Sequence, residues 1–144
     1  MNCFDFLILM KKNGAMLAPK ASFQTISLTN TNLQNIRAAI LPQFMIELYQ
    51  QCGGLNIGNG YIFGPSEIKR GRKYPIPSIV QLNTDLAGIS QLRGKTVFGR
   101  NDLFWFAFDS FGKCFMLDNT TLKELRKYEE PYRALTDCLM AGNI

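Results

Sequence analysis

Three aspartates of this chain are of the residue type that carries acid–base or metal chemistry. Asp102, Asp109 and Asp118 surround two apolar runs in the second half of the sequence. Paired carboxylates transfer protons or bind a metal ion when they share a concave site. Each of these residues stands at an expected turn or strand end, where Asp ordinarily accepts backbone hydrogen bonds. We therefore expect no catalytic residue, metal ligand or cofactor here, and an enzyme using Asp102 and Asp109 is only a third hypothesis.

Two further stretches resemble nucleotide-binding loops without meeting their requirements. Arg93-Gly94-Lys95-Thr96 has the end of a phosphate-binding loop, but the motif needs a glycine where this chain has Ile89. The glycines between residues 53 and 64 do not follow the dinucleotide-binding spacing, and they come after a helix instead of before one. Both stretches therefore indicate turns.

The residue types that support most nucleophilic catalysis are scarce. Histidine is absent, which removes His-ligated metals and Ser–His or Cys–His catalysis. The four cysteines form no C-x-x-C pair and no zinc-type spacing, so the pattern predicts buried, reduced thiols. They are Cys3, Cys52, Cys114 and Cys138. An enzyme using carboxylates, Lys or Tyr stays open, but a non-enzymatic function is favoured.

The net charge of +5 originates in one middle segment, residues 69–100. This segment contains seven basic residues and one acidic residue, whereas the rest of the chain has nine basic and ten acidic ones. A clustered positive face attracts acidic protein surfaces or nucleic acid. The alternative is a solvated loop that only keeps the protein in solution. The candidate contact residues are Lys69, Arg70, Arg72, Lys73, Tyr74 and Arg100.

The length of 144 residues predicts a single domain over residues 1–144, with its own hydrophobic core. Its longest apolar run, Leu103–Phe108, is far shorter than the ~20 residues that span a bilayer. The apolar patch Phe6–Met10 precedes Lys11 and Lys12, which reverses the order found in a signal peptide. We therefore expect a cytoplasmic protein without a membrane partner.

Four helices are expected from apolar spacing and capping residues. Thr29-Asn30-Thr31-Asn32 offers N-cap side chains, after a loop over 15–28. Pro42 suits a first helical turn, and Gly53-Gly54 suits the C′ position at the other end of that helix. The expected helices are Asn2–Asn13, Thr29–Ile40, Phe44–Cys52 and one that begins at Pro131.

The sequence VFGRNDLFWFAFDSFGKCFMLD, residues 97–118, indicates a β-hairpin at the centre of a sheet. Leu103–Phe108 is apolar throughout, which predicts burial on both faces and a core position for Trp105. Asp109 and Gly112 suit the turn, with Gly112 at positive φ. Strands are also expected at 61–63, 96–99 and 113–117, and a short helical turn at 121–126, while 79–87 fits either type of element. Helices at both ends with strands between them predict an α+β fold.

The order of these motifs resembles the SUKH superfamily, which includes the yeast Smi/Knr-type cell-wall regulators. The matching features are Leu41-Pro42 before a helix, Gly53-Gly54 after it, and the hairpin turn Asp109–Gly112, within about Asn30–Gly142. The resemblance implies a central, mostly antiparallel sheet flanked by N-terminal and C-terminal helices. Bacterial members are mostly immunity proteins that bind and neutralise secreted polymorphic toxins, many of them nucleases.

The resemblance implies a non-enzymatic function with a cognate toxin as protein partner. It also implies structural roles for Leu41, Pro42, Gly53, Gly54, Asp109 and Gly112. The basic charge departs from one expectation, because an inhibitor that mimics a nuclease's substrate is acidic. Either the toxin presents an acidic face, or the contact is not substrate mimicry, or the partner is something else. Nucleic-acid or regulatory-partner binding by residues 69–100 is the alternative, and the oligomeric state is open.

Overall fold

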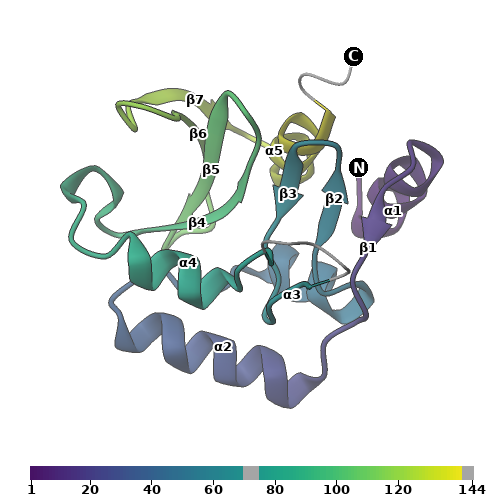
Figure 1. The fold of residues 1–144 in the computed structure, drawn as a ribbon, viewed down its shortest axis with the longest axis horizontal. Coiled ribbons are helices and arrows are strands. Elements are labelled where there is room, and N and C mark those ends of the chain that lie inside the picture. Colours follow the sequence, from purple (N-terminus) through teal and green to yellow (C-terminus); the bar gives the residue numbers. More distant parts are fainter. Residues whose placement is uncertain (70–74, 141–144) are drawn as a thin grey trace.

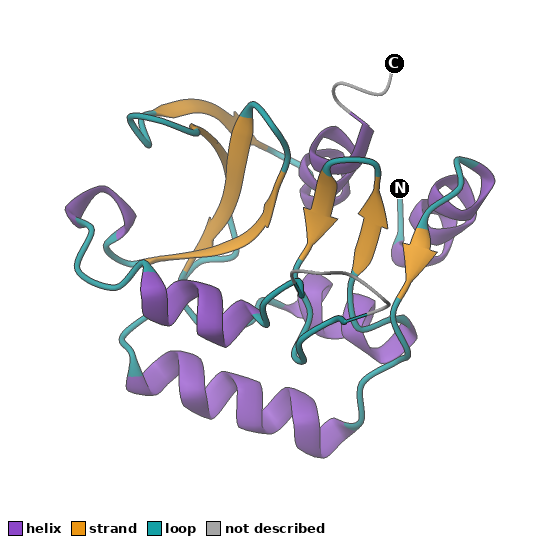
Figure 2. Cartoon of the chain, in the orientation of Figure 1, coloured by secondary structure: helices purple, strands orange, loops and turns teal. Residues whose placement is uncertain are grey.

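The computed structural model describes residues 1–69 and 75–140. Its elements in this part of the chain are α1 (Cys3–Lys12), β1 (Met16–Leu17), α2 (Phe23–Asn35), α3 (Gln43–Gln51), β2 (Leu55–Ile57), β3 (Gly60–Ile62), α4 (Ile79–Asp85), the 3-10 helix η1 (Ser90–Leu92), β4 (Lys95–Arg100), β5 (Phe104–Asp109), β6 (Cys114–Asp118), β7 (Glu124–Tyr128) and α5 (Pro131–Met140). All strands pair antiparallel in chain order, from β1 to β7 (Figures 1 and 2). The predicted α+β class, with an antiparallel sheet and helices at both ends, is confirmed.

Helix α5 occupies one face of the sheet and packs against strands β2 to β7. Figure 1 shows the strands curving around this helix. Helices α2 and α4 lie side by side beneath the strands, and α4 and η1 pack against β4. The helices therefore cover the inner face of β5, β6 and β7, and the opposite face of these three strands is called the outer face below.

The core on the inner face is built from aromatic rings. Phe98 and Phe108 stack with centroids 5.8 Å apart, and both rings meet Phe44 of α3 edge to face, at 6.2 and 6.3 Å. Tyr132 of α5 completes the cluster, 6.3 Å from Phe44. Such pairs add to the free energy gained by burying their area. The cluster joins the hairpin strands to two helices that are distant in sequence.

The second helix begins earlier than the sequence predicts. Its N-cap is Ser22, whose hydroxyl accepts a hydrogen bond from the amide of Thr25. The expected cap residues lie inside the helix, where Thr29 donates its hydroxyl proton to the Thr25 carbonyl. Ile26 and Leu33 of this helix are buried. This apolar stripe determines the extent of α2, and the prediction of a loop up to residue 28 is wrong.

Gly53 and Gly54 follow α3 as predicted, but they do not form a left-handed cap at C′. The C-cap Cys52 is extended, with φ −155°, and among these residues only Gly54 has a positive φ, of 127°. A Cβ at Gly53 would lie 2.6 Å from the Pro19 carbonyl oxygen. A Cβ at Gly64 would collide with the carbonyl oxygen of Gly53. Close backbone approach is therefore the reason for glycine here.

The predicted hairpin is confirmed, with corrections at both of its ends. Asp109 Oδ1 accepts the amides of Phe111 and Lys113, and Gly112 has φ +79°. Burial on both faces holds for residues 106–108 but not for Leu103, which is 56% exposed. The helical turn expected at 121–126 is wrong, because residues 124–128 form β7 and pair with β6. Strand β2 was not predicted.

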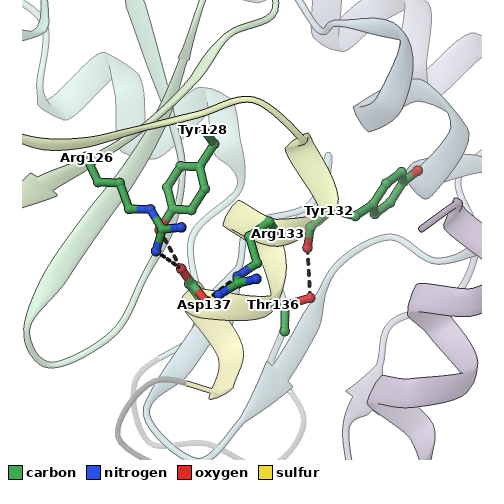
Figure 3. Close-up of polar contacts among 6 residues, drawn as sticks. All are labelled: Arg126, Tyr128, Tyr132, Arg133, Thr136 and Asp137. Carbon is green, nitrogen blue, oxygen red and sulfur yellow. Dashed lines mark hydrogen bonds and ion pairs between the residues drawn. The ribbon is translucent and has the colours of Figure 1, made fainter.

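Strand β7, at one edge of the sheet, is tied to α5 by polar contacts around Asp137 (Figure 3). The Asp137 carboxylate accepts hydrogen bonds from Tyr128 Oη at 2.8 Å and Arg126 Nη1 at 3.2 Å. Arg133, one turn earlier on α5, forms an ion pair with it at 3.4 Å. The Arg126 guanidinium also lies over the Tyr128 ring, 4.7 Å from its centroid.

Candidate functional site

The three aspartates considered for acid–base chemistry have separate hydrogen-bonding partners at turns. Asp109 binds amides of its own turn, as described above. Asp118 Oδ2 accepts the amides of Thr120 and Thr121, which lower the pKa of its carboxyl. Asp102 Oδ2 accepts the side-chain amide of Asn59 at 2.7 Å. These contacts give each carboxylate a role in turn geometry.

The described members of the basic segment lie in three places. Lys69 is exposed, near Glu67 at 3.9 Å, and lines a cavity with residues 18–22. Arg93 and Lys95 border a second cavity at the start of β4. Arg100 is at the other end of β4, five residues from Lys95 and roughly 17 Å away for extended chain. The candidate residues Arg70, Arg72, Lys73 and Tyr74 lie outside the described residues.

A β-bulge in β4 places Lys95 and Arg100 on the same face of the sheet. Val97 pairs with Ala107 and Gly99 with Phe106, so Phe98 is the additional residue. If the six residues of β4 alternated regularly, with no bulge, Arg100 would follow Lys95 by five positions and would point toward α5 instead. A Cβ at Gly99 would lie 2.8 Å from Cys138 Sγ, so the bulge packs closely against α5.

Two asparagines stabilise the backbone around this bulge and the turn that follows it. The Asn83 side chain accepts from Val97 N and donates to Val97 O, both at 2.8 Å, as a neighbouring strand would. Asn101 Oδ1 accepts the amides of Leu103 and Phe104, both at 2.9 Å, and its Nδ2 donates to the carbonyl of Cys138. Both side chains are buried. Sequence reasoning missed them because polar residues in loops and helices are usually solvated.

Arg100 lies over the only tryptophan of the chain. The Arg100 guanidinium is 5.0 Å from the centroid of the Trp105 ring, and the two residues are direct partners in the register of β4 and β5. Trp105 is half-buried at the margin of the core, which corrects the expectation that it packs in the core. Its ring faces outward because Phe104 and Phe106 take the inner positions.

Two lysines cover the second aromatic ring of the outer face. Lys95 Nζ lies 5.3 Å and Lys127 Nζ 6.0 Å from the centroid of Phe115, whose side chain is buried. Long lysine side chains cover apolar surface while their charged ends stay in water. We call Lys95, Arg100, Trp105, Phe115 and Lys127 the cation–aromatic face.

None of the three cations of this face forms an ion pair within residues 1–69 and 75–140. Asp109 is opposite Lys95 in the register, but its Oδ1 accepts turn amides and no ion pair joins the two side chains within the described chain. Lys127 and Phe115 were missed at the sequence level, because residues 124–128, ELRKY, do not alternate polar and apolar side chains and so give no strand signal.

The cysteine thiols have unreactive surroundings. All four cysteines are free, and Cys52, Cys114 and Cys138 are buried as predicted, while Cys3 is half-buried. Burial raises the pKa of Cys52 to about 11 and that of Cys114 to about 12. These thiols are therefore protonated at neutral pH, and the thiol is the poorly nucleophilic form.

Residues 1–69 and 75–140 contain no group of three or more potential metal-ligating side chains. Nor does any helix in those ranges have the length and apolar character that crossing a bilayer requires. A scan against protein-family models gives no match for this chain, and a search of curated proteins gives none either.

Proposed function

We propose that this chain is a SUKH-type immunity protein, a non-enzymatic cytoplasmic protein that binds an acidic surface of a secreted toxin. Neutralisation would follow from stoichiometric burial of the toxin's active surface. The family part of this proposal rests on the resemblance in sequence. Its support in the fold is that Pro42 occupies the N-cap position of α3 and that Asp109 and Gly112 form the turn of a β5–β6 hairpin.

The observation that carries the binding part is the cation–aromatic face. Lys95, Arg100 and Lys127 are held against rings and have no carboxylate partner in the described chain. A ring beneath a cation restricts its motion, so less side-chain entropy is lost when an acidic partner binds. Interface hot spots are enriched in Trp and Arg, which are paired here.

The burial of Phe115 favours a protein partner over nucleic acid. Single-stranded nucleic acid binds by stacking its bases on exposed aromatic rings. Phe115 is only 6% exposed beneath its two lysines. Trp105 has Arg100 over its ring and is half-buried. An acidic protein surface can use the cations of this face without requiring access to either ring.

Charge reversal tests the proposal directly. The neighbouring open reading frame is examined for a toxin domain, and that domain is co-expressed with the chain while growth is measured, with calorimetry on the purified pair. The variant combining Lys95→Glu, Arg100→Glu and Lys127→Glu should bind about 100-fold more weakly and lose protection, because three attractions become repulsions. The matched control reverses the exposed Lys11, Lys12 and Lys20, which lie off this face, and should keep protection.

Unchanged protection by the outer-face variant, with circular dichroism like that of the wild type, would overturn the assignment of this face. Absence of any complex between the wild-type chain and the toxin domain would overturn the immunity function itself. Binding of random single-stranded RNA that weakens steeply with salt would support the nucleic-acid alternative instead.

A further inference from the structure

A cavity of about 230 Å³ opens where the C-terminal ends of α2 and α4 approach the start of β4. Three cationic residues line it, and they come from three separate segments. Arg37 follows α2, Arg93 follows η1 and Lys95 begins β4. Among the described residues lining the cavity there is no carboxylate, and no ion pair within the described chain involves any of the three.

The two helix ends at this cavity do not need the cations as caps. Basic residues near a helix C-terminus commonly bind its free carbonyls. At α2, however, the amides of Arg37 and Ala38 already donate to the carbonyls of Gln34 and Leu33. At α4 the amide of Ala87 donates to Thr84. The backbone therefore satisfies the carbonyls of Leu33, Gln34 and Thr84, and the cations are not required there as hydrogen-bond caps, although their charge offsets the negative ends of the two helix dipoles.

Arg37 occupies a backbone conformation that glycine would adopt at lower cost. Its φ is +61°, at the position after the C-cap where helices commonly end in glycine. Among the described residues, Leu122 is the only other non-glycine residue with a positive φ. An arginine at such a position has a backbone cost that a contact made by its side chain can offset.

We propose that this cavity binds a small phosphate-bearing anion through Arg37 and Arg93. Lys95 lines the margin of the cavity, but its ammonium lies over Phe115 on the outer face. Arginine forms paired hydrogen bonds with phosphate oxygens, which suits the two guanidinium groups to this ligand. The volume is below the ~300–1,000 Å³ of pockets for drug-sized ligands, and it suits one or two phosphate groups. The base of a nucleotide would therefore lie outside the cavity. The surrounding sequence is not a phosphate-binding loop, because it leads into a strand and Thr96 Oγ1 is engaged with the Ala39 carbonyl at 2.6 Å.

This proposal is independent of the toxin-binding proposal, although Lys95 borders both sites. The test uses no protein partner and leaves Lys95 unchanged. Failure of anion binding would not affect the outer-face assignment, and failure of toxin binding would not affect the anion site.

The full chain is titrated with inorganic pyrophosphate at constant ionic strength, and the binding constant and the thermal midpoint are measured. We expect saturable binding and a rise in the midpoint. Arg93→Gln should weaken binding at least tenfold. Arg37→Gly should also weaken it at least tenfold, while raising the thermal midpoint without ligand because glycine removes the strain at φ +61°. Lys12→Gln, on the exposed surface of α1, makes the same charge change and should bind like the wild type.

Two ligands separate the sources of phosphate. If the chain binds pyrophosphate as tightly as it binds ADP, the site is assigned to free phosphates. If it binds ADP more tightly, the site is assigned to a nucleotide. Both outcomes support the proposal. Equal binding by the wild type, Arg93→Gln and Arg37→Gly would overturn it, and so would absence of saturable binding to the wild type. A gain in stability for Arg37→Gly with unchanged affinity would likewise show that the arginine serves no anion.

Discussion

Arg126 and Arg100 each lie over an aromatic ring, but only Arg126 has a carboxylate partner in the described chain. Arg126, which lies over Tyr128, forms an ion pair with Asp137, and Asp137 also accepts a hydrogen bond from the Tyr128 hydroxyl and so joins β7 to α5 (Figure 3). Arg100 lies over Trp105 on the outer face at a similar distance, 5.0 Å against 4.7 Å for Arg126, without an ion pair in the described residues. The difference teaches that position on a ring does not define the role of a cation. Asp137 makes the Arg126 pair a structural contact between β7 and α5. Arg100 has no carboxylate partner in the described surroundings, so a binding partner can supply one.

The largest loss of folding stability is expected for Asn83→Ala, because Asn83 hydrogen-bonds the β4 backbone beside the bulge that positions Arg100. Asn83→Ala leaves the amide and the carbonyl of Val97 without their side-chain partners in a buried place. An unsatisfied buried polar group costs about 1–3 kcal/mol, so we expect a loss of about 3 kcal/mol in the free energy of unfolding. Urea denaturation measures it. Thr84→Ala on the exposed side of the same helix is the control, and equal losses in the two variants would contradict a special role for Asn83.

A smaller loss is expected when the carboxylate is removed from the Arg126 pair. Asp137→Asn weakens contacts with Tyr128, Arg126 and Arg133. Hydrogen bonds to charged groups contribute more than neutral ones, but this site is partly exposed, so a loss of about 1–2 kcal/mol follows. Thermal or urea denaturation measures it, with Arg100→Gln as the comparison, for which we expect less than about 1 kcal/mol. If Arg100→Gln destabilised the fold as much as Asp137→Asn, the two pairs would have the same structural role.

The smallest effect on folding stability is expected from the titration of the Tyr128 phenol at high pH. Burial first, then the hydrogen bond and charge of Asp137, raises the pKa of this phenol well above its usual value of 10.0. A raised pKa in the folded state means that the stabilisation is complete below pH 10 and is lost as the pH rises further. The loss from this group is less than about 1 kcal/mol at pH 10. Phenolate absorbance should show a lower pKa for Tyr128 in Asp137→Asn and no change in Arg100→Gln, and a shift in Arg100→Gln would contradict the separation of the two pairs.

The parts of the fold that local patterns determine were predictable from the sequence. Apolar spacing and Pro131 gave the last helix, and Asp109 with Gly112 gave the hairpin turn. The start of α2 was not predicted, because Ser22 and Thr29 have equal capping chemistry and only the burial of Leu33 chooses between them. Strand β7 was also missed, since its charged sequence pairs at an edge where one face is solvated.

The candidate site was predictable only in part, because sequence position did not indicate which cations are close together. Arg100 was among the predicted contacts, yet its neighbour Trp105 was placed in the core. Lys127 lies outside the basic segment, but the β6–β7 register brings it to Phe115. Arg37 is also distant in sequence, and it reaches the start of β4 only through the packing of α2 against α4. Long-range contacts of this kind leave no mark on local composition.

The bulge at Phe98 lets β4 contain one residue more than the stretch of β5 with which it pairs. Loss of Phe98 would close the bulge but leave Gly99 opposite Phe106 and Arg100 opposite Trp105, so the guanidinium would stay on the outer face. The chain would instead lose the ring that stacks on Phe108 and meets Phe44 in the core. A change in strand length at this point would therefore alter the stability of the fold and not the charge that the outer face presents.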